Sequence, residues 1–200
     1  MENVLIDSVP TFANYLRRRI EIYGGEFLYL SQESLMVFLY TYSLISNENN
    51  LIDKVFVDYP IAKESGSRNK IDIFINVEPE YYIEVKYVRP IPSEWNIPLP
   101  QHRGKLINDI IKLVAQTSPS SNKYLLLVAS REFIVHLSNK PGFPQSKTAW
   151  RGRIRNLVLA VTEEKQISKE NKPYLDREIK QQLLSQEKAN ALHILLWKIV

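Results

Sequence analysis

The chain contains no cysteine among its 200 residues. Disulfide bonds, cysteine nucleophiles and zinc sites built on thiolates are therefore excluded. Long hydrophobic runs are also missing, because stretches such as LMVFLYTYSLI and YLLLVAS are too short to cross a bilayer. The N-terminal segment MENVLIDSVP lacks the basic start and apolar run of a signal peptide. We therefore expect a cytoplasmic protein with no membrane partner.

Charge is distributed unevenly along the sequence. The net charge is +4, yet residues 101–155 hold ten Lys or Arg residues and only two acids. Such a basic segment suits a surface that follows phosphates. Arg151, Arg153 and Arg155 form its densest cluster and are candidates to bind nucleic acid. A solvated basic face without a ligand explains this single feature equally well.

Hydrophobic spacing predicts the element order α-α-β-β-β-α-β-(α)-β-α. The first helix is expected over about residues 10–22. A second begins after an N-cap at Ser31, with Leu30 and Leu35 as a hydrophobic staple. Its expected core stripe consists of Leu35, Phe38, Leu39, Tyr42 and Ile45. Strands are predicted at 51–60, 70–77, 81–88, 123–130 and 155–161, and helices at about 104–115 and from about 174 onwards.

This order predicts an α/β sandwich with a mixed central sheet. We expect a single domain over residues 1–200, with a core at about 30–161. The helix at 10–22 and helices at 174–199 are expected to be additions to that core. The apolar C-terminal helix is expected to pack on the core or to form a dimer contact.

Two neighbouring strands carry the residues with chemical potential. If Asp72 lies opposite Glu84, then Phe74 opposes Tyr82 and the two carboxylates lie side by side, with Cβ atoms about 4.5–5.5 Å apart. Lys86 follows two residues later on the same strand face. Burying two ionised carboxylates costs several kcal/mol each without a cation. Hard oxygen ligands suit Mg²⁺ or Mn²⁺. The simpler alternative is a structural Glu–Lys pair on an exposed sheet face.

The pattern of Asp72, eleven further residues and then Glu84-Val85-Lys86 resembles the D-x(n)-E-x-K core of the PD-(D/E)xK nucleases. The resemblance covers about residues 30–161, and it departs from the family pattern where Ile71 replaces the proline before the aspartate. It implies a restriction-endonuclease-like fold, which is a three-layer α/β/α sandwich with a mixed central sheet.

The resemblance also implies roles for the matched residues. Asp72, Glu84 and the backbone carbonyl of Val85 would bind Mg²⁺ or Mn²⁺, and Lys86 would orient or deprotonate the attacking water. Many members of the family add an acid from the first core helix, and Glu33 matches that position best. Ordinary complementarity to the helix dipole explains Glu33 equally well. Glu26 is the second candidate for this role.

The expected function is a metal-dependent endonuclease acting on nucleic acid, with DNA as the expected substrate and a homodimer as the expected assembly. Family members commonly place polar or basic residues beside the scissile phosphate, and Gln101, Arg103 and Lys105 match that position. A non-catalytic nucleic-acid-binding module on the same fold is the main alternative, and an assembly protein that associates through its C-terminal helix is another. The sequence does not distinguish duplex, branched or single-stranded DNA from RNA.

Overall fold

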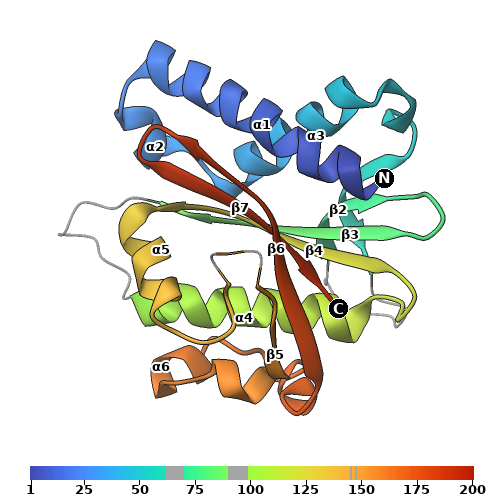
Figure 1. Ribbon diagram of the computed structural model, residues 1–200, viewed down its shortest axis with the longest axis vertical. Coiled ribbons are helices and arrows are strands. Elements are labelled where there is room, and N and C mark those ends of the chain that lie inside the picture. The colour runs from blue at the N-terminus through green and yellow to red at the C-terminus, as the bar shows by residue number, and fades with distance from the viewer. Residues whose placement is uncertain (62–69, 90–98, 145, 147) are drawn as a thin grey trace.

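The computed structural model describes residues 1–61, 70–89, 99–144, 146 and 148–200. These residues form one mixed sheet with helices on both of its faces (Figure 1). The α-helices are α1 (Glu2–Tyr23), α2 (Glu26–Leu30), α3 (Glu33–Asn47), α4 (Leu99–Gln116), α5 (Arg131–Ser138) and α6 (Val161–Glu164). The strands are β1 (Val55–Pro60), β2 (Lys70–Ile75), β3 (Tyr81–Val88), β4 (Asn122–Ser130), β5 (Trp150–Arg153), β6 (Glu178–Ala189) and β7 (Leu192–Ile199). Short 3-10 turns are η1 (Asn49–Leu51), η3 (Ile154–Leu157) and η4 (Lys172–Tyr174).

Within the described residues the strand order is β1-β2-β3-β4-β7-β6-β5. Strands β3 and β4 are parallel, and each of the other neighbouring pairs is antiparallel. A parallel connection needs a crossover, and α4 lies between β3 and β4 in the chain. The sequence prediction of an α/β protein with a mixed central sheet is therefore confirmed.

The sheet separates two hydrophobic cores. Successive side chains of a strand point to opposite faces, and β4 divides its residues accordingly. Leu126 and Val128 pack in the core that contains α1 and α3, whereas Leu125 and Leu127 pack in the core that contains α4 and α5. Figure 1 shows these two helical layers on opposite sides of the sheet. The predicted fully buried strand at 123–130 is confirmed.

The predicted packing of α3 is wrong in part, although Leu39 is buried as expected. Phe38 and Tyr42, expected in the core, are 59% and 51% exposed. Met36, Tyr40 and Leu44 are buried instead. The N-cap is Gln32 rather than Ser31, and the staple is absent because Leu30 is 77% exposed. Because α3 carries apolar residues on both faces, hydrophobic spacing alone did not identify which face is buried.

The predicted C-terminal helices are also wrong. Residues 178–199 form the hairpin of β6 and β7. β7 pairs with β4 from Lys123↔Ile199 to Ser130↔Leu192, so this segment is part of the sheet rather than an addition to it. The strand expected at 155–161 is absent: η3 occupies 154–157, and α6 begins at Val161.

Candidate active site

The site forms where β2 and β3 separate. The recorded register pairs Ile73 with Ile83 and Phe74 with Tyr82, which confirms the predicted alignment of the two strands. At the next position along β2, the Oδ2 atom of Asp72 accepts a hydrogen bond from the backbone N–H of Val85 at 2.7 Å. A carboxylate thus occupies the place of a backbone carbonyl in the ladder. The side chain of Asp72 is thereby fixed against the edge of β3.

Glu33 occupies the next position along this edge. Its Oε2 atom accepts a hydrogen bond from the N–H of Tyr87 at 3.0 Å. Alternate residues of a strand direct their backbone groups to the same edge, so Val85 and Tyr87 donate on the same side. The carbonyl of Val85 faces that side too, because the N–H and C=O of one extended residue point together. The first turn of α3 therefore places Glu33 close to Asp72.

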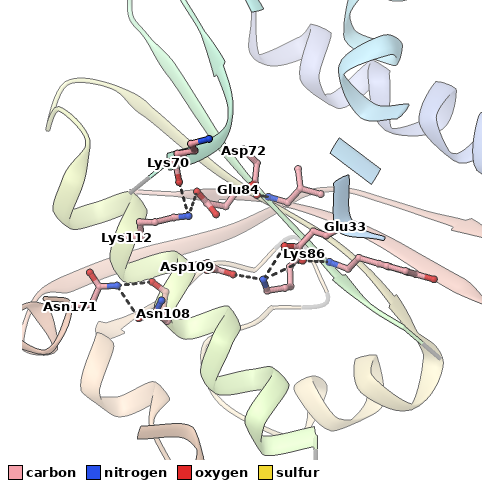
Figure 2. Close-up of polar contacts among 11 residues, drawn as sticks. Glu33, Lys70, Asp72, Glu84, Lys86, Asn108, Asp109, Lys112 and Asn171 are labelled. Carbon is pink, nitrogen blue, oxygen red and sulfur yellow. Dashed lines mark hydrogen bonds and ion pairs between the residues drawn. The ribbon is translucent and has the colours of Figure 1, made fainter. Parts of the chain in front are cut away.

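Two lysines hold the acids of the site in ion pairs (Figure 2). The Nζ atom of Lys86 lies 3.2 Å from Oε2 of Glu33 and 3.1 Å from Oδ2 of Asp109. The Nζ atom of Lys112 lies 2.7 Å from Oε1 of Glu84. Asp109 and Lys112 both belong to α4, so one helix supplies an acid and a base to the site.

The cluster contains more negative than positive charge. Among the described residues, four carboxylates, those of Glu33, Asp72, Glu84 and Asp109, face two ammonium groups. Burial raises the pKa of Asp72 to about 6, although the Val85 N–H and Lys112 oppose this shift. Burial, followed by the charges of Asp72 and Asp109, raises the pKa of Glu84 well above its usual range. When all six groups are ionised, the deficit equals the charge of one divalent cation.

The donor set fits a divalent metal in its chemistry. Among the residues that the structure describes, no three or more His, Asp or Glu side chains are arranged to hold a metal ion. A Mg²⁺ ion usually keeps several waters and takes one or two carboxylates from the protein. Asp72, Glu84 and the carbonyl of Val85 are oxygen donors of that kind, and burial together with neighbouring carboxylates raises the pKa of both acids.

Five of the predicted site residues are therefore brought together: Glu33, Asp72, Glu84, Val85 and Lys86. Glu26 is exposed on α2, so Glu33 is the acid next to Lys86. Gln101 is half-buried and Lys105 is exposed, both on α4.

The predicted arginine cluster lies elsewhere in the sheet. Arg151 and Arg153 are exposed on β5, which three strands separate from β3. Arg155 is exposed and forms an ion pair with Asp176 at 2.5 Å. The sheet therefore does not bring these arginines next to the acidic cluster.

The assignment of Arg103 to nucleic-acid binding is corrected by its position. Its side chain is fully buried, and Nη1 lies 2.8 Å from Oε2 of Glu163. The guanidinium also donates to the carbonyls of Leu157 and Pro141. A guanidinium enclosed in this way is unable to contact a phosphate, and Arg103 instead ties α4 to α6.

Asp109 and Lys112 were not predicted as site residues. Their signal in the sequence is weak but real: they are three residues apart, which places them on one face of a helix. Their neighbours Ile110, Ile111 and Leu113 are buried. Charged residues inside such an apolar run need partners, and only the fold shows that these partners are Lys86 and Glu84.

No family model, curated protein or solved structure matches the chain. In the part of the chain that the structure describes, none of the helices combines the length and hydrophobicity needed to cross a bilayer. The fold and site together define an α/β protein with a partly buried acid–lysine cluster where β2 and β3 separate. Function is therefore inferred from the chemistry of this cluster.

The Asp72→Asn substitution is expected to stabilise the metal-free protein at alkaline pH. A carboxyl whose pKa is raised by folding binds protons more tightly in the folded state, so the wild type loses stability as the pH rises from about 4 through about 6. The amide cannot ionise and still accepts from Val85. In EDTA, we expect the free energy of unfolding of the variant to exceed that of the wild type by on the order of 2 kcal/mol at pH 8, and to equal it at pH 4.

Urea denaturation at both pH values measures this difference. The control is Asp53→Asn, which removes an exposed carboxylate and should change stability little at either pH. A loss of stability in Asp72→Asn at pH 8 would contradict the electrostatic interpretation.

Proposed function

We propose that the chain is a metal-dependent nuclease of the PD-(D/E)xK type that hydrolyses phosphodiester bonds of DNA. The observation that supports this most is the placing of half-buried Asp72 and buried Glu84 together, with Asp72 held on the Val85 N–H and Lys86 on the same strand as Glu84. Ion pairs that serve stability alone do not need this excess of acid. The proposal also rests on the sequence resemblance described above.

In this proposal Asp72 and Glu84 hold the metal, with the carbonyl of Val85 as a further donor. A bound Mg²⁺ supplies Lewis-acid polarisation of the phosphate and lowers the pKa of a coordinated water. The chain's part is to fix these donors before substrate arrives. Asp72 is held by the Val85 N–H, and Glu84 is fixed by its burial in β3. Because these donors are already in position, no free energy is needed to reorganise them during the reaction.

Lys86 acts in its protonated form. Burial by itself lowers the pKa of this lysine, but Asp109 and then Glu33 outweigh burial and raise it above the usual value. At neutral pH the ammonium therefore cannot accept a proton from water. It instead donates hydrogen bonds, which orient the attacking water and offset the charge that develops on the phosphate. Of the two roles considered from the sequence, orientation is the one that the contacts favour.

The test is cleavage of plasmid, single-stranded and branched DNA by the purified chain with Mg²⁺, Mn²⁺ or EDTA. We expect cutting with either metal and none with EDTA. The matched variant is Lys86→Met, which keeps the length of the side chain and removes its charge. Its cleavage rate should fall by about 10²-fold or more. Lys86→Arg should retain more activity than Lys86→Met, because it keeps a charged donor.

Two outcomes would count against the proposal. Cutting that survives EDTA would mean that the metal is not required. Equal cutting by Lys86→Met would point to a contaminating nuclease or to a different site. Salt-sensitive DNA binding with no cutting of any substrate would favour a non-catalytic binding module.

A further inference from the structure

Lys112 lies in an oxygen-rich position beside the proposed metal ligands. Its Nζ atom lies 2.7 Å from Oε1 of Glu84. It also donates a hydrogen bond to the backbone carbonyl of Lys70 at 2.9 Å. Asp72 is close enough for Lys112 to act on its pKa. Figure 2 shows the ammonium reaching from α4 to Glu84 and the start of β2. Carboxylate and carbonyl oxygens around one cation are also the ligands that Mg²⁺ prefers.

In its ionised form, Glu84 needs a cation when no metal is bound. Its side chain is only 4% exposed, and a buried carboxylate without a partner is strongly destabilising. Lys86 is unable to fill this role, because its own ammonium is held by Glu33 and Asp109. Among the residues that the structure describes, Lys112 is therefore the partner of Glu84 in the metal-free fold.

We propose that the ammonium group of Lys112 occupies the metal site in the metal-free protein. It forms an ion pair with Glu84 there and moves away when a divalent ion binds. This inference rests on the proposed function. An ammonium at 2.7 Å from Glu84 and a metal on the same carboxylate would repel each other strongly. The side chain of Lys112 is 18% exposed and sits on a flexible four-carbon stem, so it has a route to solvent.

The first test is Mn²⁺ binding by isothermal titration calorimetry, without any nucleic acid. Lys112→Met removes the competing charge, and we expect its Kd for Mn²⁺ to fall by about tenfold or more. Lys169→Met is the control, because it removes an exposed lysine to which no role in the site is assigned; its Kd should change by less than about twofold. Unchanged or weaker binding by Lys112→Met would overturn the inference.

The second test uses the wild-type chain and does not depend on the folding of a variant. Amine-reactive labelling followed by mass spectrometry reports how accessible each lysine is. We expect labelling of Lys112 to rise when Mg²⁺ is added, while labelling of Lys105 stays constant. Equal labelling of Lys112 with saturating Mg²⁺ and with EDTA would overturn the inference.

The two proposals fail in different ways. If neither the wild type nor Lys112→Met binds Mn²⁺, the proposed metal site itself is wrong. If both bind Mn²⁺ with equal affinity, only the role of Lys112 is wrong, and the nuclease proposal stands.

Discussion

Replacing Glu84 with glutamine is expected to abolish metal-dependent cleavage. The substitution keeps the volume of the side chain but removes one of the two carboxylates proposed to hold the metal. Metal ions contribute several kcal/mol of charge stabilisation to phosphoryl transfer. This corresponds to a fall in rate of about 10³- to 10⁴-fold. Calorimetric Mn²⁺ binding should be lost together with cleavage.

The control for this prediction is Glu164→Gln, which changes an exposed glutamate on α6. It should cleave and bind Mn²⁺ as the wild type does. Circular dichroism and urea denaturation should show that Glu84→Gln is folded, since Lys112 keeps its bond to the carbonyl of Lys70. Unimpaired cutting by a folded Glu84→Gln or Glu84→Ala variant would refute the assignment of the active site.

The central part of the site was predictable because strand geometry is regular. Alternation and a short connection set the register of β2 and β3, which pairs Ile73 with Ile83 and so brings Asp72 and Glu84 to the point where the strands separate. Both segments were predicted as strands rather than helices, since β-branched and aromatic residues dominate them. Glu33 was predicted only through the family resemblance. Its hydrogen bond to Tyr87 depends on how α3 meets β3, which no local pattern encodes.

The C-terminal hairpin was not predictable from hydrophobicity alone. The run ALHILLWKIV is apolar at nearly every position, and such a run suits a buried helix or a buried strand equally. The informative residue is Asn190, which has a φ of 54° between β6 and β7. Asparagine is one of the few residues that adopt this left-handed conformation readily, so it marks a hairpin turn.

The charged residues of α4 show that the partners of side chains are also not predictable from local sequence. From the sequence, Arg103 and Lys112 were both members of one basic segment. In the fold, Arg103 is buried against α6, whereas Lys112 pairs with Glu84. A count of charges does not reveal which of them have internal partners. That distinction requires the packing of α4 between the sheet and α6, which involves residues far apart in the chain.

The buried pair of Arg103 and Glu163 leads to the second large prediction. Arg103→Met is expected to lower the free energy of unfolding by about 3–5 kcal/mol, because it leaves the Glu163 carboxylate buried without its counter-ion. Glu163 Oε2 would still accept from the N–H groups of Leu159 and Ala160, at 2.6 and 3.2 Å. Two backbone donors do not neutralise a charge. Urea denaturation at neutral pH measures the loss.

A double substitution separates the ion pair from simple loss of packing. Arg103→Met combined with Glu163→Gln removes both charges, and the amide oxygen can still accept from Leu159 and Ala160. We expect this double variant to recover more than half of the stability lost by Arg103→Met alone, since coupled neighbours are not additive. DNA affinity of the folded single variant should equal that of the wild type. If Arg103→Met instead keeps its stability and loses DNA affinity, Arg103 is a phosphate ligand and α4 must open to expose it.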